Sequence, residues 1–435
     1  MPKKKTALTI EERLQQALVP AEEQPYEVPE NWVWVRLGAI AEIVTGGTPS
    51  KKHPEYYGGN FPFYKPSDLD QGRLTYDASE YLSEEGKNVS RIIPKNSTAV
   101  CCIGSIGKCG YLMCEGTTNQ QINSAIPKIN SLCLYYYLCT ENFVQDLLSM
   151  ASATTIAIVN KSKMESCAFP LPPLSEQQRI VERIEELFAK LDEAKERLQE
   201  VADSFAVRKA AILHNAFTGE LTKQWRWENG VRDESWEEKK LSEITENQDS
   251  KRIPLSKSQR DNMNRIYDYY GASGIIDKVD DYIFEGKKLL IGEDGANLVT
   301  RSKDIAFIAD GKYWVNNHAH ILDVKDTVLL MYLCNYINNM DLIPYVTGSA
   351  QPKLTQAKMN NIKIFLPTLP EQHEIVRLID DLLARERAAQ QAAEQALASI
   401  DLMKKSILAR AFRGELGTNK ASEASALELL RQVLS

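Results

Sequence analysis

The sequence lacks the patterns that would place it among common enzymes, membrane proteins or secreted proteins. Its 435 residues include five histidines and contain no H-E-x-x-H pattern and no recognisable Ser/His/Asp arrangement. The Asn/Asp-Pro-Pro-aromatic loop with which amino-methyltransferases hold their target amine is also missing. No apolar run approaches the roughly 18 residues of a membrane span. Because no apolar segment follows the basic start, Met1 to Lys5, we expect no signal peptide and a cytoplasmic protein.

Metal-binding and basic signatures are equally weak. The eight cysteines form no C-x2-C pair, so we expect buried, reduced thiols and no metal site; a metal held by Cys109 and Cys114 is the weaker alternative. The net charge of −7 and the pI of about 5.6 show no general signature of nucleic-acid binding. An interpretation as a DNA-binding protein must therefore depend on local patches, or on a partner that supplies positive charge.

Two short patterns suggest chemistry only superficially. The stretch from Cys102 to Cys109 resembles a phosphate-binding loop, but it lacks the four-residue spacing between glycines and the Ser/Thr after its lysine. Asp281, Glu285 and Lys287 contain the E-x-K tail of a nuclease pattern, yet matches of this length are common by chance. We therefore predict no catalytic residue.

The most informative feature is an internal repeat. Residues 171–221 return as residues 366–416 under one constant shift of 195 positions. Glu176-Gln177 then aligns with Glu371-Gln372, and Gly219 aligns with Gly414. A match over some fifty positions without a gap indicates a duplicated structural unit.

Each copy of the repeat predicts one long helix. Apolar residues recur with a mean spacing of 3.5, which is typical of a coiled-coil seam. Prolines before Glu-Gln predict where each helix begins, and Gly219 and Gly414 where each ends, giving about 40 residues or roughly 60 Å. The expected seam residues are Ile184, Leu187, Leu191, Leu198, Val201 and Phe205 in the first helix, and Ile379, Leu382, Ala389, Ala393, Ala396, Ile400 and Met403 in the second.

The two seams are complementary in size. Large residues occupy the middle of the first helix, and alanines occupy the middle of the second. Antiparallel pairing would let the large side chains fill the space that the alanines leave. The spacing alone leaves open an alternative, in which the two helices pack on separate domains.

The repeat defines the predicted architecture. We expect an α+β fold with two mixed α/β domains, separated by two long antiparallel helices that form a coiled coil, in a pseudo-two-fold arrangement. The expected order is an N-terminal helix and linker (1–30), a first variable domain (31–170), a first long helix (171–221), a linker and second variable domain (222–365), a second long helix (366–416) and a C-terminal tail (417–435).

The two variable domains share landmarks. Each opens on a tryptophan, Trp32 or Trp236, with Leu five and Ile eight residues further on. Asn119 to Asn123 corresponds to Asn316 to His320. We expect strands at 98–103, 110–113, 288–291 and 305–309, and helices at 132–149 and 328–338.

Short helices are predicted near both ends of the sequence. Thr9 caps one that runs to Val19, and an amphipathic pattern spans Ala424 to Leu434. Since the first repeat continues into a linker where the second ends, we hypothesise that the C-terminal tail and the N-terminal segment lie together.

These features together resemble the specificity subunit of type I restriction-modification enzymes, over essentially the whole chain. The resemblance depends on Pro170 to Gln178 with its copy at 366–373, on Ala-Phe-Thr-Gly-Glu-Leu (216–221) with Ala-Phe-Arg-Gly-Glu-Leu (411–416), on Gly46 to Ser50 with Pro54 to Gly59, and on Tyr269 to Ile275 with Ile291 to Ala296.

The resemblance implies a division of labour. The variable domains would be target recognition domains, each reading one half of a split, asymmetric site in double-stranded DNA. The helices would set the gap and dock two copies of a DNA methylation subunit, which carries S-adenosylmethionine and flips the target adenine. Motor-nuclease subunits, which use ATP and Mg, would complete a complex that cleaves unmodified DNA. This chain itself would hold no catalytic residue and no cofactor.

The resemblance gives candidate regions rather than individual base contacts. Asn and Gln side chains suit base edges, and lysines suit phosphates. Local basic clusters are Lys51-Lys52, Lys161 with Lys163, and Lys251-Arg252 with Lys257, Arg260 and Arg265. The candidate DNA-binding residues are Thr48, Pro49, Ser50, Lys51, Lys52, Asn119, Gln120, Gln121, Thr154, Thr155, Asn160 and Lys161 in the first domain, and Tyr270, Gly271, Ala272, Ser273, Gly274, Asn316, Asn317, His318, Ser349, Gln351 and Lys353 in the second.

Two alternatives stay open at this point. The same kind of subunit could serve a methylation-only system, or one with a fused methylase and nuclease. A coiled-coil scaffold that binds protein rather than DNA would also fit the helices.

Overall fold

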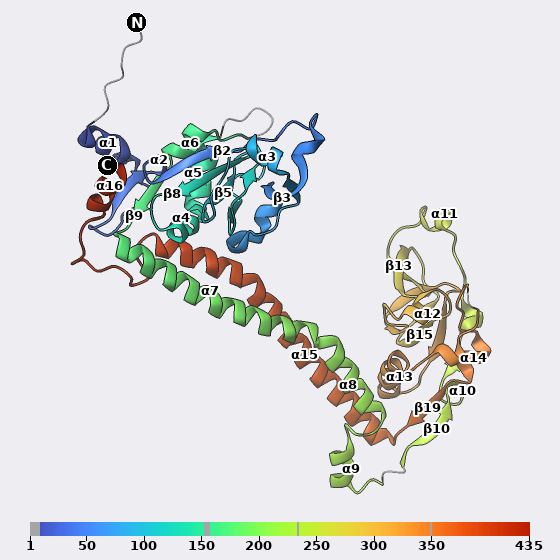
Figure 1. Cartoon of the computed structure of the whole chain (residues 1–435). Helices are drawn as coiled ribbons and strands as arrows, with labels where there is room; N and C mark the ends of the chain where they lie inside the picture. Colours follow the sequence, from blue (N-terminus) through green and yellow to red (C-terminus); the bar gives the residue numbers. More distant parts are fainter. Residues whose placement is uncertain (1–8, 152–156, 233–234, 349) are drawn as a thin grey trace. The chain divides into compact units, whose positions relative to one another are not determined.

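The computed structural model describes residues 9–151, 157–232, 235–348 and 350–435 (Figure 1). Contacts divide the chain into two units: residues 1–197 with 396–435, and residues 198–395. The division runs through the long helices, so each unit contains one variable domain and part of both helices. In the described ranges, no helix is long and apolar enough to cross a membrane.

The first unit is built on two small sheets. A four-stranded antiparallel sheet has the order β2 (Ala41–Thr45), β8 (Ile122–Pro127), β5 (Thr98–Cys101) and β6 (Cys109–Tyr111). A three-stranded sheet has the order β4 (Glu80–Leu82), β3 (Tyr57–Tyr64) and β7 (Thr117–Thr118), with β3 parallel to β7. A separate antiparallel pair, β1 (Val33–Arg36) with β9 (Ala168–Leu171), joins the two ends of the domain.

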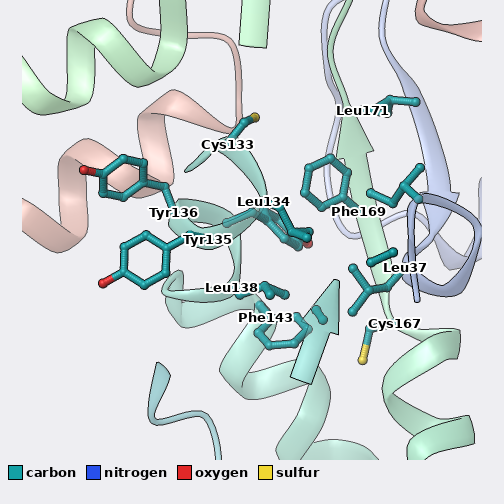
Figure 2. Close-up of a cluster of buried hydrophobic side chains, with 14 of the residues drawn as sticks. Leu37, Cys133, Leu134, Tyr135, Tyr136, Leu138, Phe143, Cys167, Phe169 and Leu171 are labelled. Atoms are coloured by element: carbon teal, nitrogen blue, oxygen red, sulfur yellow. The ribbon is translucent and has the colours of Figure 1, made fainter. Parts of the chain in front are cut away.

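The core of the first unit lies between its strands and three helices. These are α4 (Ser131–Leu138), α5 (Glu141–Met150) and α6 (Lys161–Ser166). Figure 2 shows Phe169 of β9 beside Leu134 of α4, with Leu37 close by; all three are fully buried. The single helix predicted over 132–149 was wrong, because the Thr140 hydroxyl accepts a hydrogen bond from the Phe143 amide and starts a second helix there.

The second unit repeats this sheet topology, with one additional strand in its second sheet. Its four-stranded sheet has the order β11 (Glu246–Asn247), β18 (Ala319–Asp323), β15 (Lys288–Gly292) and β16 (Ala306–Ala309). The second sheet has the order β13 (Gly274–Val279), β12 (Tyr267–Gly271), β17 (Lys312–Val315) and β14 (Phe284–Glu285), with β12 parallel to β17. The pair β10 (Glu237–Lys240) with β19 (Lys363–Leu366) closes the domain, and α13 (Thr327–Asn339) matches the predicted helix. The repeat read from the sequence therefore extends to the fold of the variable domains.

Several short helices lie in the connections between the longer elements of both units. They are α2 (Leu37–Ile40) and α3 (Glu84–Asn88) in the first unit, and α9 (Lys223–Asn229), α10 (Leu241–Ile244), α11 (Lys257–Arg260), α12 (Asn297–Thr300) and α14 (Gln356–Asn360) in the second.

The long helices pair antiparallel inside each unit. The helices are α7 (Leu174–Asp203), α8 (Phe205–Phe217) and α15 (Leu369–Ala411). In the first unit Asp192 pairs with Lys404, and Arg179 reaches Glu423 beyond the end of α15. In the second unit Arg208 pairs with Glu386, and Thr222 with Glu371. The expected single first helix is interrupted at Ser204, whereas the second is continuous.

The predicted seam was only partly right. Val201 and Met403 are 39% and 48% exposed, and Ala389 is exposed, so these three do not belong to a buried seam. On α15 the inward position belongs to Lys404 instead of Met403, because its ammonium pairs with Asp192 and lies 5.1 Å from the centre of the Phe188 ring. Of the other predicted seam residues, Ile184, Ile379, Ala393 and Ile400 are buried, and Leu187, Leu191, Leu198, Phe205, Leu382 and Ala396 are half-buried.

The repeated Glu-Gln pair closes the start of each long helix. Glu176 is fully buried and accepts hydrogen bonds from Trp32 Nε1 (2.7 Å), Thr418 Oγ1 (3.2 Å) and Asn419 Nδ2 (2.8 Å). Its copy Glu371 is also fully buried and accepts from Thr222 Oγ1 and Arg226 Nη1, both at 2.7 Å. In each unit, a carboxylate at the start of one long helix therefore holds the segment that follows the end of the other.

Among the described residues, the helix nearest the N-terminus and the helix nearest the C-terminus lie together, as hypothesised. Helix α1 (Ile10–Ala17) packs beside α16 (Ala426–Leu434) in Figure 1. Arg13 Nη1 donates to the Leu434 carbonyl at 2.9 Å, and Leu14 shares a buried cluster with Leu430. The predicted Thr9 cap is confirmed as a capping box with Glu12.

The buried pair Arg226–Glu371 predicts a measurable loss of stability. In the variant Arg226→Met the Glu371 carboxylate would remain buried without its cation, which should lower the free energy of unfolding of the full chain by about 3 kcal/mol in urea titrations. Arg385→Met removes an exposed ion pair with Asp381 from the same helix and should cost under about 0.5 kcal/mol. Equal losses in the two variants would contradict the role given to Glu371.

Candidate nucleic-acid interface

Loops from distant parts of the first domain meet at one edge of its four-stranded sheet. They follow the ends of β2 and β5 and precede β8. The Gly47 amide donates to the Thr118 carbonyl (2.8 Å), the Cys102 amide to the Gln121 carbonyl (2.7 Å), and the Val159 amide to the Cys102 carbonyl (2.9 Å). We call residues 46–52, 102–107, 118–121 and 157–161 the first loop edge.

Close backbone approach at this edge requires glycine. A Cβ on Gly46 would stand 2.1 Å from the Asn119 carbonyl oxygen, so no other residue fits there. Across the same contact, the Thr48 hydroxyl donates to Gln120 Oε1 at 2.5 Å. The structure thus brings together the predicted segments 48–52 and 119–121, which are about seventy residues apart in the sequence.

The second domain repeats this arrangement with nearly identical backbone bonds. The Glu293 amide donates to the His318 carbonyl (2.8 Å), and the Leu354 amide donates to the Glu293 carbonyl (2.8 Å). The Asn316 amide donates to the Tyr270 carbonyl (3.0 Å), as the Asn119 amide does to Tyr64 (3.1 Å). Residues 271–274, 293–295, 316–318 and 350–354 form the second loop edge.

Three candidate residues support the loops instead of facing outward. Asn119 Oδ1 accepts from the Gln121 amide (3.0 Å), and Asn316 Oδ1 accepts from the His318 amide (2.8 Å). Both asparagines and Tyr270 are at most 9% exposed. Their expected role as base-contacting side chains is therefore replaced by a structural one, in which each asparagine closes an Asx turn.

The remaining candidates divide by exposure. Pro49, Gln121, Ala272 and Gly274 are half-buried, and Gly271 is buried. Thr154, Thr155 and Ser349 lie outside the described residues. The exposed candidates are Thr48, Ser50, Lys51, Lys52, Gln120, Asn160 and Lys161 at the first edge, and Ser273, Asn317, His318, Gln351 and Lys353 at the second.

The lysines of the two edges differ in their partners. Within the described part of the chain, Lys51 and Lys52 form no ion pair, whereas Lys161 lies 3.6 Å from Glu165. Lys353 Nζ lies 3.1 Å from Glu293 Oε1 and remains half-exposed. The edges therefore carry cations that a phosphate could approach.

A cluster of polar and charged side chains lies beneath the second loop edge, and the sequence analysis did not predict it. His320 Nδ1 lies 2.6 Å from Asp249 Oδ2, and its Nε2 donates to the Leu354 carbonyl at 2.7 Å. Arg252 Nη1 donates to Glu293 Oε2 at 2.6 Å. Arg252 and Arg260 belong to a local basic cluster of the sequence, but Arg252 is half-buried in this ion pair and Arg260 is paired with Asp277.

The two buried carboxyls keep their charge despite burial. Burial raises the pKa of Asp249, but the hydrogen bond and charge of His320 outweigh it and hold this pKa below its ordinary value of 3.8. Burial likewise raises the pKa of Glu293, but Arg252, His320 and Lys353 bring it below 4.5. In the first domain Asn123 takes the place of His320 and donates to the Val159 carbonyl at 3.3 Å. The same backbone framework thus has different side chains beneath it.

The cysteines are confirmed as free thiols. All eight are buried or half-buried and form no disulfide. Burial raises the pKa of the Cys102 thiol to about 11, which disfavours the reactive thiolate. Among the residues that the structure describes, no group of three or more His, Cys, Asp or Glu side chains could hold a metal ion.

The fold and its loop edges define a class: two copies of one recognition domain, joined by long antiparallel helices. The model of the family described as "Type I restriction modification DNA specificity domain" matches residues 29–203 and again 233–396. The chain belongs to this family, as a specificity subunit with two DNA-recognition domains. The resemblance read from the sequence is confirmed.

Named relatives agree with this assignment. The chain is 40% identical over 147 residues to the putative type I restriction enzyme specificity subunit S.HindORF215P of Haemophilus influenzae, a stretch that spans 34% of this chain and 37% of that relative. It is 25% identical over 424 residues to the type I restriction enzyme EcoDI specificity subunit of Escherichia coli, covering 90% of each.

A solved structure has the same fold. The crystal structure of the HsdS subunit from Thermoanaerobacter tengcongensis matches with a TM-score of 0.65 at 18% identity, over 90% of this chain and 99% of that one. At this identity the likeness concerns the fold alone.

The depressed pKa values of Asp249 and Glu293 predict acid sensitivity. Since both folded-state pKa values lie below the ordinary ones, the unfolded chain takes up protons first as the pH falls. The free energy of unfolding should therefore decline from about pH 5 to pH 3. In urea titrations, Asp249→Asn should show a shallower decline, whereas Glu285→Gln, which removes an exposed carboxylate of the same unit, should not. Equal slopes in all three proteins would contradict this account.

Proposed function

We propose that the two loop edges each read one half of a split, asymmetric sequence in double-stranded DNA. The observation that carries this proposal is the shared backbone framework of the two edges, which presents different side chains in each domain. Equivalent amides and carbonyls fix both sets of loops, from Cys102 with Gln121 in one to Glu293 with His318 in the other. A common scaffold with unlike exposed groups suits two readers of two different half-sites.

The exposed chemistry at the edges fits a duplex. Gln120 and Asn317 can pair with base edges in the major groove, where an amide can bond an adenine at two points. Lys51, Lys52 and Lys353 can contact phosphates. With a net charge of −7, the chain depends on partners for much of its attraction to DNA.

Those partners are two copies of a DNA methylation subunit, one for each half of the pseudo-symmetric chain. They bind S-adenosylmethionine and methylate adenine, and they dock along the long helices. Motor-nuclease subunits with ATP and Mg complete a complex that cleaves unmodified DNA. The complex acts in the cytoplasm.

The paired helices set the distance between the half-sites. Helix α15 has 43 residues and extends without interruption, which corresponds to roughly 65 Å. Within each unit α15 pairs antiparallel with α7 or α8, and the buried Glu176 and Glu371 hold the helix ends.

Replacing Lys353 tests the second loop edge. Lys353→Ala should weaken binding of the complex with its methylation partner to its own site about fivefold, and lower the salt dependence by about one phosphate contact. Fluorescence anisotropy with labelled duplexes at several salt concentrations measures both. Lys325→Ala, an exposed lysine beyond the opposite end of β18, is the matched control and should change neither. Unchanged affinity in Lys353→Ala would count against this edge as a DNA-binding surface.

A further inference from the structure

Two adjacent isoleucines are exposed on one edge strand of the second domain. Ile275 and Ile276 of β13 are 55% and 54% exposed. Successive residues of a regular strand point to opposite faces, so one of such a pair usually packs inward. Exposure of both leaves an apolar patch of which about half the surface is accessible.

A β-bulge causes this double exposure. In the pairing of β12 with β13, Tyr269 lies opposite Asp277 and Tyr270 lies opposite Ile275, so Ile276 has no partner. A bulge inserts one extra residue and re-aims the side chains around it. Here it turns both isoleucines away from the core.

The patch is continuous with the second loop edge. A Cβ on Gly271 would lie 3.0 Å from Ile276 Cδ1 and 3.4 Å from Asn316 Nδ2, so Ile276 sits over Gly271 beside the Asx turn. The turn of the same hairpin also touches the end of β15, since a Cβ on Gly292 would lie 2.6 Å from the Ala272 carbonyl oxygen. The isoleucines therefore adjoin the loops that present Asn317 and His318.

The charges around the patch are largely paired. Asp277 bonds Arg260 at 2.8 Å, Asp268 lies 3.2 Å from Lys278, and Asp294 lies 2.8 Å from His318. Two of these carboxylates, Asp277 and Asp268, are thus compensated by cations, and the half-exposed Lys353 belongs to the same edge. Because paired carboxylates repel the neighbouring DNA phosphates less, an apolar contact with a base can form here.

We propose that Ile275 and Ile276 contact the 5-methyl group of a thymine in the second half-site. This inference rests on the proposed function, because it takes the second loop edge as the surface that meets the duplex. The thymine methyl is the apolar group that base pairs display in the major groove, and apolar side chains read it. Through this patch the second domain selects an A·T pair at the position that the isoleucines contact.

The first reader is built differently at the corresponding strand. Its β4 carries Glu80, Tyr81 and Leu82, of which Leu82 is fully buried. Selection of a thymine methyl by an isoleucine pair therefore belongs to the second half-site.

Deoxyuridine substitution tests the contact, because it removes the methyl group and keeps the base pair. Once the methylated site is known, each thymine of both half-sites is replaced singly, and binding of the complex with its methylation partner is measured by anisotropy. One substitution in the second half-site should weaken binding about fourfold, the value expected for one buried methyl group. In the double variant Ile275→Ala/Ile276→Ala that difference should vanish, whereas in Ile266→Ala, 58% exposed at the other end of the hairpin, it should persist.

Several results would overturn the inference. They are a second half-site without thymine on either strand, no sensitivity to any single substitution there, or a sensitivity that survives in the double variant. Loss of assembly with the methylation partner in the double variant would instead identify the patch as a protein contact. In each of these cases, specific DNA binding by the wild-type complex in the same titrations would still support the proposed function. Failure of the wild-type complex to bind DNA would reject the proposed function itself.

Discussion

Two buried carboxylates, Glu176 and Glu371, hold the ends of this molecule's long helices. Each belongs to the first turn of its helix, where a negative charge also suits the helix dipole. Each accepts hydrogen bonds from the segment that leaves the other long helix, through Thr418 in one unit and Thr222 in the other. A buried carboxylate is tolerable only with such partners, so pairing of the helices and closure of their ends depend on each other.

The two domains share a backbone framework, whereas the side chains on that framework differ. The main four-stranded sheets of the two domains have equivalent strand orders, and equivalent backbone bonds fix the loops at one edge of each. Side chains under the loops differ, with Asn123 in one domain where His320 and its charged neighbours stand in the other. Apart from the close approach at Gly46 and the Asx turns of Asn119 and Asn316, these backbone bonds require no particular side chain, so a domain of this kind can change what it presents and keep its shape.

Sequence reasoning succeeded where the signal was repeated or periodic. The constant shift of 195 positions located the long helices, the two domains and their order. Comparison of the ends of the two copies led to the hypothesis that the terminal segments, which contain α1 and α16, lie together.

Reasoning from the sequence failed where burial decides the role of a polar residue. Asn119 and Asn316 were expected to face a ligand, yet they are buried turn formers. Arg252 stands out in the sequence only as part of a local basic cluster, whereas the structure pairs it with Glu293. On α15 the heptad spacing predicted the apolar Met403 in the seam, and Lys404 was not considered. The ion-pair partner of Lys404, Asp192, is 212 residues away, so no local sequence pattern indicates the pair. Such roles are set by contacts between distant segments, which one sequence does not display.

The central claim is that two readers are held apart by paired helices. The most direct measurement maps methylated sites in DNA from cells that express the chain with its methylation partner, with and without one heptad inserted in each long helix, after Arg197 and after Gln395. A heptad keeps the helix faces in phase and adds about 10 Å. The account predicts two unlike half-sites, unchanged in sequence by the insertion, with a gap longer by about two to three base pairs. An unaltered gap, or a single continuous site, would contradict it.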